Sequence, residues 1–372
     1  MFTGDERIEK ATRVRVRAQL PRRLAGDGSP GTLAAALAPA LMRLTMGFNH
    51  DRSLLPASYL QDPKLLAAYM ARFTPLGADR VRFALGQGGA AFARLRGLAG
   101  ERPLRLLDVG AGPGSATLGA LSALDLSGDA PPPVCVLIDR TRSALEEAAR
   151  LADAAGFRAR LVRIAHDVTR GLPEGPAFAQ PFDLILVANM LNELSESRRG
   201  RFVQRLAALL APEGLLLAVE PGTQAAARDL IALRDRLGEL ATVAPCPHDL
   251  PCPLHAQNRR DWCHVAAPYN RSAWIDALDR VCGLDHTRLV FSYWLARQAA
   301  DGVLPAGPSR IVSDLLKDEG GSVRLLCTPS GLRRVSAAAF GVAYRGQPWT
   351  EKIPSQPANA SSRPRKERPR RN

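Results

Sequence analysis

The fold of this chain follows from one stretch, Leu104-Arg105-Leu106-Leu107-Asp108-Val109-Gly110-Ala111-Gly112-Pro113-Gly114. A short apolar run ends in an acid and a valine, and glycines then recur at alternate positions before a helical pattern begins. Glycine adopts backbone conformations that other residues avoid, and it lets a ligand lie against the main chain. The stretch therefore predicts a first strand, a ligand-binding turn and a first helix.

Downstream of this turn, short apolar runs alternate with helical segments. Such alternation is typical of a parallel sheet that helices cover on both faces. We expect strands at Leu104–Val109, Val134–Ile138, Arg160–Ile164, Phe182–Ala188 and Leu215–Val219, and helices at Ser143–Ala155 and Arg198–Leu210. The sequence thus predicts an α/β fold with a Rossmann-like sheet.

Composition along the chain divides it into four regions. Residues 1–102 have a helical pattern, residues 103–224 form the sheet core, and residues 225–349 hold a Cys-rich segment. Two β-like runs in the third region, Arg288–Arg297 and Ser322–Thr328, are expected to complete the sheet as an antiparallel edge. Residues 350–372 are rich in Pro, Ser, Arg and Lys without apolar anchors, which is typical of a disordered basic tail.

The overall charge is strongly basic, with 50 Lys and Arg against 36 Asp and Glu and a net charge of +14. Basic surface favours polyanionic partners, although a soluble protein can also be basic without binding nucleic acid. We find no apolar run long enough to span a bilayer and no secretory signal, so we expect no membrane association. Six cysteines in such a chain favour a reducing cytoplasm over a disulfide framework.

Two cofactor classes use a Gly-rich turn between a first strand and a first helix. Dinucleotide-binding proteins have the spacing G-x-G-x-x-G and place a pyrophosphate on the helix N-terminus. Here Gly110, Gly112 and Gly114 follow G-x-G-x-G, and Asp108 precedes them. An acid at that position would repel a pyrophosphate but could hold the cationic aminoacyl end of S-adenosylmethionine (SAM). The turn therefore predicts a SAM site.

Polar residues at the ends of the later strands extend this site. Asp139 ends the second strand and is placed to accept hydrogen bonds from the ribose hydroxyls, and Asp167 is placed to address the adenine amino group. After the fourth strand, Asn189, Asn192 and Glu193 are the candidate catalytic residues, with Asn189 also a cofactor residue. They could orient or deprotonate a methyl acceptor, or simply cap the next helix. This loop has no recognisable catalytic motif.

Four cysteines cluster late in the sequence. Cys246, Cys252 and Cys263 lie in a segment rich in Pro and His, and a fourth thiol is available from Cys327. Proline-rich backbone keeps such loops rigid, which suits a metal site. Four thiolates fit an iron–sulfur cluster or zinc, and nearby histidines keep a mixed zinc site open. The C-x3-C-x2-C loop of radical SAM chemistry is absent, so a structural role is favoured.

Combined, these features resemble one family over roughly Pro56–Trp349. A methyltransferase-like core is followed by Cys-Pro-His, Cys-Pro-Leu and Trp-Cys-His segments, then by Phe291-Ser292-Tyr293 and an Arg-rich stretch that ends at Cys327. This order is similar to that in bacterial relatives of the mitochondrial small-ribosomal-subunit methyltransferase-like proteins, which include methyltransferase-like protein 17.

The resemblance implies a class I methyltransferase fold, SAM binding, a [4Fe–4S] cluster on Cys246, Cys252, Cys263 and Cys327, and association with the small ribosomal subunit and its rRNA. We expect a monomer in the bacterial cytoplasm that methylates rRNA, takes part in subunit assembly, or both. Two alternatives stay open, namely an assembly factor that binds the cofactor without transferring its methyl group, and a small-molecule methyltransferase.

Overall fold

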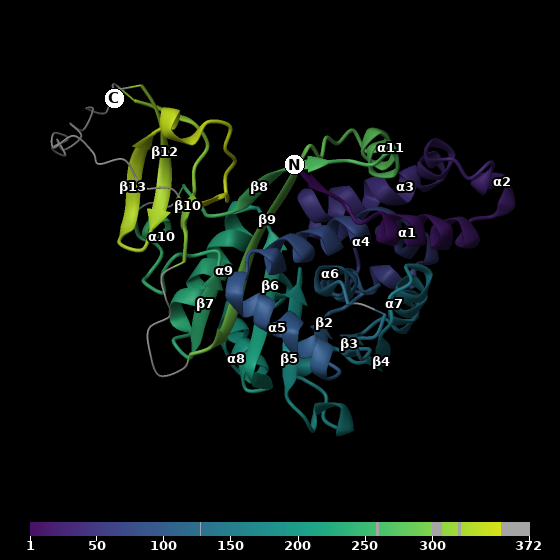
Figure 1. The fold of residues 1–372 in the computed structure, drawn as a ribbon. Coiled ribbons are helices and arrows are strands. Elements are labelled where there is room, and N and C mark those ends of the chain that lie inside the picture. Colours follow the sequence, from purple (N-terminus) through teal and green to yellow (C-terminus); the bar gives the residue numbers. More distant parts are fainter. Residues whose placement is uncertain (127, 258–259, 300–306, 319–320, 351–372) are drawn as a thin grey trace.

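A nine-stranded sheet forms the centre of the molecule (Figure 1). The computed structural model describes residues 1–350 except 127, 258–259, 300–306 and 319–320, so the predicted basic tail lies outside the described residues. The parallel strands are β2 (Arg105–Val109), β3 (Val134–Asp139), β4 (Arg160–Ala165), β5 (Phe182–Ala188) and β6 (Leu210–Pro221). The prediction of an α/β fold with a mainly parallel sheet is confirmed.

The order β4-β3-β2-β5-β6 places β2 between β3 and β5. Val109, the last residue of β2, lies opposite Ile138 of β3 and Val187 of β5. The carboxyl ends of these three parallel strands therefore meet at one edge of the sheet, where the Gly-rich turn begins. Binding sites in open α/β sheets form at this kind of edge.

Helices cover both faces of the sheet. One face carries the large core cluster built with α4, α6 and α7, and the other carries a second cluster built with α8 and α9. These helices and the remaining N-terminal ones have the bounds α1 (Glu6–Gln19), α2 (Arg22–Ala25), α3 (Pro30–Asn49), α4 (Pro63–Gly86), α5 (Gly89–Glu101), α6 (Ser115–Leu124), α7 (Arg142–Ala154), α8 (Glu196–Ala207) and α9 (Gln224–Arg236).

The antiparallel side of the sheet is built around β9 (Arg288–Gln298), which pairs with β6 along one edge. Its other edge is shared by β7 (Leu240–Ala244) and β8 (Val265–Asn270), and β1 (Phe2–Thr3) pairs with β8. β9 thus has strand partners on both edges, and the structure differs at this point from the sequence-based expectation. The run Ser322–Thr328 forms β12 (Gly321–Thr328), but it does not join the central sheet.

Instead, β12 is the middle strand of a separate sheet, seen in yellow in Figure 1. Its other strands are β10 (Ser309–Ile311), β11 (Leu316–Asp318), β13 (Gly331–Ser336) and β14 (Pro348–Trp349). A small core that includes Ile311, Leu326 and Phe340 fills it. The short helix α10 (Pro253–Gln257) and the helix α11 (Ala273–Val281) complete the described α-helices.

The N-terminal helices pack onto the core instead of forming a separate body. Helix α4 starts with Pro63, and Asp62 caps it by accepting hydrogen bonds from the N–H groups of Lys64 and Leu65 at 2.8 and 3.4 Å. Among the described residues, α3 is the one helix long and apolar enough to cross a membrane by length and composition alone, contrary to our expectation of no such run. Its buried side chains, such as Leu37 and Leu41, belong to the main core.

Candidate functional site

The three glycines of the turn all have left-handed backbone conformations, with φ of 74° at Gly110, 51° at Gly112 and 82° at Gly114. A Cβ at Gly114 would lie 2.9 Å from Ala148 Cβ, and one at Gly110 would lie 2.9 Å from Met190 Cγ. At Gly112 the nearest atom, Leu60 Cδ1, would be 3.7 Å away, which is an ordinary van der Waals contact. Glycine is required here for both conformation and close packing.

The N–H groups of the turn bond within the protein. Those of Gly110 and Ala111 both donate to Ile138 O at 2.9 Å, and that of Gly114 donates to Ala111 O at 2.8 Å. The Gly112 N–H donates to the Asp139 carboxylate at 2.9 Å. A dinucleotide fold uses free N–H groups at this place to hold a pyrophosphate. With these four donors engaged, the turn is poorly suited to that ligand.

Asp139 closes β3 and lies where the sequence places it, in the wall of a cavity beside the turn. Its second oxygen accepts from the Thr141 N–H at 2.7 Å. Burial raises the pKa of this carboxyl, and the hydrogen bonds from Thr141 and Gly112 oppose that shift. Each oxygen can still accept further bonds, so Asp139 remains suited to bind ligand hydroxyls.

Asp108 lies beneath the turn and does not line the cavity. Its side chain is only 2% exposed, and one oxygen accepts from the Thr117 N–H at 2.9 Å and from the Thr117 hydroxyl at 2.6 Å. Burial raises the pKa of Asp108 to about 6, against the effect of these bonds. In this structure the residue ties β2 to the first turn of α6.

Asp167 and Asn189 both line the cavity, together with Asn192 and Glu193. Asp167 accepts from the Thr169 N–H and hydroxyl, and the hydroxyl bond is the largest cause of its lowered pKa. Asn189 has a φ of 53°, an unusual conformation for a residue other than glycine, and it follows β5 directly. Such conformations often occur at functional sites.

Glu193 is paired with two arginines from different parts of the chain. Its carboxylate lies 3.0 Å from Arg52 Nη2 and 3.5 Å from Arg140 Nη2. Arg52 belongs to the N-terminal region and Arg140 follows β3, so Glu193 links both to the loop after β5. The two arginines engage the carboxylate oxygens of Glu193, so these oxygens are not free to take a proton from an acceptor in this arrangement.

The cavity itself has a volume of about 430 Å³. The sequence predicted the residues that line this cavity at the strand ends. It did not predict the opposite wall, which comes from the N-terminal helical region. That wall carries aromatic and basic side chains from α3, α4 and the short turns between them, namely Phe48, Arg52, Tyr59, Tyr69, Arg72, Phe73 and Arg80. A sequence pattern alone gives no sign that this wall meets the turn, because its residues lie far from residues 110–114 in the chain.

Within this wall, Tyr69 and Phe73 stack with their ring centroids 5.3 Å apart. Arg52 lies over the rings of Phe48 and Tyr59 at 5.5 and 5.3 Å. Aromatic and guanidinium faces of this kind bind planar, electron-rich groups well. The cavity thus combines a polar wall at the strand ends with an aromatic wall opposite.

Sequence reasoning missed Glu220, which supports the loop beside the cavity. This residue lies near the end of β6 and is 2% exposed. Its Oε1 accepts from the N–H groups of Met190 and Leu191 at 3.2 and 2.9 Å, and its Oε2 has no hydrogen-bond partner among the described residues. Burial raises the pKa of Glu220 to about 7. Its position near a strand end is the one signal that could have identified it.

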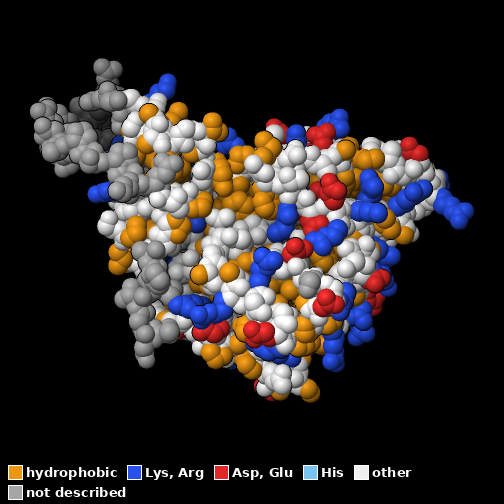
Figure 2. All heavy atoms as spheres, in the orientation of Figure 1, with side chains coloured by type: hydrophobic (Ala, Val, Ile, Leu, Met, Phe, Trp, Pro, Cys, Tyr) orange, Lys and Arg blue, Asp and Glu red, His pale blue; other side chains and the backbone are white. Residues whose placement is uncertain are grey.

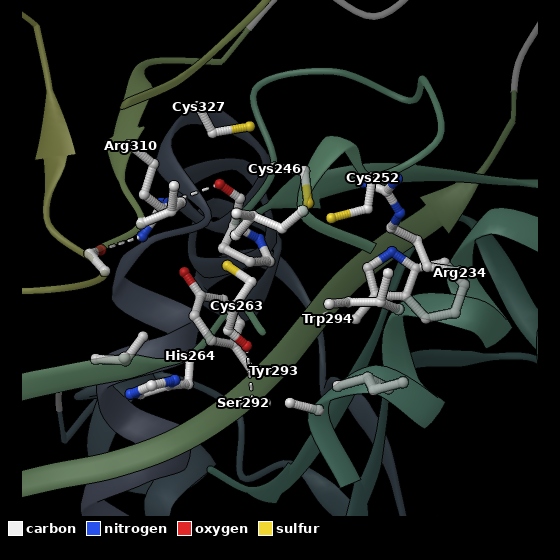
Figure 3. A pocket seen from close by; sticks show the side chains of 18 of the residues that line it. Arg234, Cys246, Cys252, Cys263, His264, Ser292, Tyr293, Trp294, Arg310 and Cys327 are labelled. Atoms are coloured by element: carbon white, nitrogen blue, oxygen red, sulfur yellow. Dashed lines mark hydrogen bonds between the residues drawn. The ribbon is translucent and has the colours of Figure 1, made fainter. Parts of the chain in front are cut away.

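The four predicted cysteines line a second pocket, which lies between the two sheets (Figure 3). Cys246 follows β7, Cys252 precedes α10, Cys263 precedes β8, and Cys327 is in β12. Figure 3 shows their thiols gathered around a common space, although they come from separate segments.

A break in the central sheet makes room for this pocket. β7 pairs with β9 at residues 295–298, and β8 pairs with β9 at residues 288–291. Between them, Ser292, Tyr293 and Trp294 of β9 have no strand partner on that edge, and all three line the pocket. The Cys-rich segment therefore leaves the sheet between β7 and β8 and covers the unpaired part of β9.

Burial raises the pKa of Cys263 to about 12, with Cys246 and Cys252 as the next causes, and it also raises the pKa of Cys252 and Cys327. Cys327 Sγ lies 3.5 Å from His248 Nε2. Among the described residues, no group of three or more His, Cys, Asp or Glu side chains is arranged to hold a metal ion. The thiols share one pocket without forming a compact single-ion site.

Several buried polar atoms around these cysteines lack partners in the part of the chain that the structure describes. They are Arg234 Nη1, Tyr293 Oη, His248 Nδ1 and His264 Nδ1. Arg310, which is 3% exposed, donates instead to Pro245 O at 2.6 Å and to Gly346 O at 2.5 Å. Arg310 therefore ties the loop of Cys246 to the second sheet.

Comparison with known proteins gives a family match across most of the chain. The model of the family described as mitochondrial small ribosomal subunit Rsm22 matches residues 98–345. This range includes the Gly-rich turn and all four clustered cysteines, and it leaves out the aromatic wall of the cavity. Together with the mainly parallel sheet, the match supports the predicted class I methyltransferase fold. No curated protein gives a significant match to the sequence.

Solved structures similar to this chain include several methyltransferases. Mitomycin 7-O-methyltransferase MmcR is 14% identical over 79% of this chain and 69% of its own, with a TM-score of 0.36. A SAM-dependent methyltransferase from Clostridium acetobutylicum is 18% identical over 32% of this chain, with a TM-score of 0.25, and only 42% of its length is spanned. Magnesium protoporphyrin IX methyltransferase from Synechocystis is 10% identical over 77% of this chain and 97% of its own, with a TM-score of 0.34. These similarities are too weak to assign a cofactor or substrate.

Proposed function

The chain belongs to the mitochondrial small ribosomal subunit Rsm22 family, and on that premise we propose that it binds SAM and methylates rRNA of the small ribosomal subunit. One observation carries the cofactor assignment. The cavity of about 430 Å³ brings the Gly-rich turn, Asp139 and Asn189 together at the carboxyl ends of β2, β3 and β5. The expected cytoplasmic location and monomeric state are part of this proposal.

The chemistry of the cavity favours SAM over a dinucleotide. Four N–H groups of the turn are engaged within the protein, so a pyrophosphate would find few free donors there. Asp139 is suited to accept hydrogen bonds from the ribose hydroxyls, and Asp167 is suited to the adenine amino group. Asn189 and Asn192 are the candidates that would orient the methyl acceptor, since both line the same cavity.

We propose that the acceptor is a nucleobase, because the wall opposite the sheet is aromatic and basic. Tyr69 and Phe73 offer stacked ring faces, and Arg52 adds positive charge. Enzymes that modify a base in RNA or DNA read it by stacking and edge hydrogen bonds. On the molecular face seen in Figure 2, basic side chains are scattered among acidic ones, so the local cavity wall supports this proposal better than overall charge does.

An assembly factor without methyl transfer is the second candidate function. It is favoured by Glu193, whose pairing with Arg52 and Arg140 leaves no evident general base among the candidate catalytic residues. A factor of this kind would use the bound cofactor to stabilise the cavity instead of consuming it.

Labelled methyl transfer to immature small subunits separates the two functions. The wild-type chain is expected to transfer label to rRNA, and Gly112→Arg is expected to transfer none because the new side chain would enter the cavity. Gly97→Arg is the matched control, since Gly97 is exposed on α5 and a Cβ added there would meet no other atom within 4 Å. If the chain co-sediments with the subunit but no variant transfers label, the assembly factor is favoured. If the chain neither co-sediments nor transfers label, a small-molecule methyltransferase is favoured.

We also propose that the cysteine pocket holds a [4Fe–4S] cluster through Cys246, Cys252, Cys263 and Cys327, with zinc as the alternative. The donor set fits, because soft thiolates are the ligands that both metals prefer. The unpartnered donors of Arg234 and Tyr293 suit the negative charge that four thiolates would bring.

The spacing of the thiols bears on the choice between the two metals. A single tetrahedral zinc with bonds of about 2.3 Å needs its four sulfurs in close contact, and no such compact group occurs among the described residues. A [4Fe–4S] cluster binds each thiolate to a different iron, so its four sulfurs need not be in contact. Once bound, it would supply a structural link between β12 of the second sheet and the loops at β7 and β8.

A further inference from the structure

Arg80 lies in the cavity wall where helix α4 approaches the Gly-rich turn. Phe73, Leu76 and Arg80 recur at helical spacing, and all three line the cavity. Between them, Gly77 packs so closely on α6 that a Cβ there would lie 3.0 Å from Ser115 Cβ. Because Ser115 is the first residue of α6, Arg80 is positioned next to the start of the helix that follows the turn.

Arg80 has no ion-pair partner among the described residues, and its buried Nε has no hydrogen-bond partner. Arg72, on the same helix and in the same cavity, differs because it lies 3.1 Å from Asp279 and also contacts His286. Burial lowers the pKa of Arg80 to about 10, and the charge of Arg72 acts in the same direction. A half-buried guanidinium that pairs with no anion is costly, so a bound anion is expected beside it.

None of the acids that line the cavity forms an ion pair with Arg80 among the described residues. Asp139 accepts from backbone N–H groups, Asp167 from Thr169, and Glu193 pairs with Arg52 and Arg140. Among the described residues no carboxylate forms an ion pair with Arg80, and the neighbouring Asp79, whose charge acts on it, pairs instead with Arg82. A directly paired anion would therefore come from a ligand.

SAM carries one anion, the α-carboxylate of its aminoacyl end. The N–H groups of the turn at residues 110, 111, 112 and 114 are engaged within the protein and do not offer it a hydrogen bond. Resting on the proposed SAM site, we infer that Arg80 binds this carboxylate and so selects a cofactor with an intact amino-acid end. A guanidinium matches the planar geometry of a carboxylate and can bind it through two parallel hydrogen bonds.

The test compares SAM with decarboxylated SAM, which lacks only the carboxylate, by calorimetric titration of the full-length protein. Wild type is expected to prefer SAM by about 10- to 100-fold, the range for a hydrogen bond to a charged group. Arg80→Met is expected to lose most of this preference, and Arg80→Lys to keep part of it. Arg52→Met is the matched control, because it removes a positive charge from the same cavity and should change both affinities by the same factor.

Stability of the ligand-free protein provides an independent readout. If Arg80 only stabilises the packing of α4, Arg80→Met is expected to lower the Tm of the ligand-free protein. If Arg80 binds a ligand and is unpaired without it, the Tm is expected to stay the same or rise. If wild type binds SAM and decarboxylated SAM equally well, the assignment of Arg80 is overturned but the SAM site is not. If wild type binds neither ligand, both the assignment of Arg80 and the SAM site are overturned. An unchanged SAM preference in Arg80→Met, with weaker RNA binding, would assign Arg80 to an acceptor phosphate and also overturn the inference.

Discussion

At the scale of single residues, Glu220 shows how a buried carboxylate organises the loop after β5. It accepts the N–H groups of Met190 and Leu191, which lie beside the candidate residues Asn189 and Asn192. Its second oxygen has no partner within the described residues, so the negative charge is poorly solvated. The protonated form is therefore favoured in the folded protein, and the pKa is raised to about 7.

This shift predicts how stability depends on pH. The folded state holds a proton on Glu220 that the unfolded state, with a pKa near 4.5, releases. The contribution of Glu220 to the free energy of unfolding is thus fully present below the unfolded pKa and is lost as the pH rises towards about 7. Glu220→Gln keeps an acceptor for the loop but cannot ionise. We expect its free energy of unfolding to rise relative to wild type by roughly 1 kcal/mol per pH unit between these values.

Urea unfolding at several pH values measures this difference. Glu174→Gln is the control, since that side chain is exposed and its substitution should give a difference that does not vary with pH. A constant offset between Glu220→Gln and wild type from pH 5 to pH 8 would contradict the assignment of a titrating, buried Glu220.

At the scale of elements, the break between β7 and β8 is what creates the cysteine pocket. Both strands pair with β9, and the segment between them carries Cys246, Cys252 and Cys263. The fourth thiol, Cys327, comes from β12 of the other sheet. A bound metal group would therefore link the two sheets through the four thiolates. Its removal would be expected to destabilise both sheets near the pocket.

Cys327→Ser tests this link. We expect the metal content of anaerobically purified protein to fall at least about tenfold, because even outer-shell changes commonly lower metal affinity by 10–100-fold. Hydrogen exchange should also speed up in β10 and β12, as it should in wild type treated with a chelator. Elemental analysis for iron, zinc and sulfide provides the readout.

The control is Cys282→Ser, since Cys282 ends α11 and does not line the pocket. Full metal content in Cys327→Ser, or a wild-type protein that contains neither iron nor zinc, would contradict a metal site in this pocket.

Sequence patterns were most informative where function depends on neighbouring residues. The Gly-rich turn and Asp139 could be located because a strand end and a glycine spacing are local features. The place of Asp108 beneath the turn depends on Thr117, on the next helix, so the pattern did not reveal it. The place of β12 could not be foreseen either, because it depends on β7 and β8 having already filled the edge of β9.

At the scale of the whole molecule, the candidate site joins regions that lie far apart in the chain. Arg52 and Glu193 are separated by 141 residues and pair in the wall of the cavity. The aromatic wall precedes the part of the chain that the family model matches. The proposed cofactor site thus lies at the strand ends, and the N-terminal helices carry features that would distinguish this chain's acceptor.

The basic C-terminal segment, which lies outside the described residues, is expected to contribute to rRNA binding through charge alone. Residues 351–372 contain seven Lys and Arg and two Glu. Deleting them should weaken binding to small subunits and make the slope of log K against log salt less negative by about 1 to 5, since each phosphate contact contributes about 0.7 to 0.9. Filter binding over a salt series measures this slope, and an unchanged slope would contradict a role in phosphate binding.

The most direct test of the central claim is mass-spectrometric mapping of rRNA methylation in a deletion strain complemented with wild type, Gly112→Arg or Gly97→Arg. If the chain is a SAM-dependent rRNA methyltransferase, one methyl mark on small-subunit rRNA is lost on deletion. Wild type and Gly97→Arg restore that mark, and Gly112→Arg does not. If every mark is retained while immature small subunits accumulate, the methyltransferase assignment is contradicted and the protein is an assembly factor.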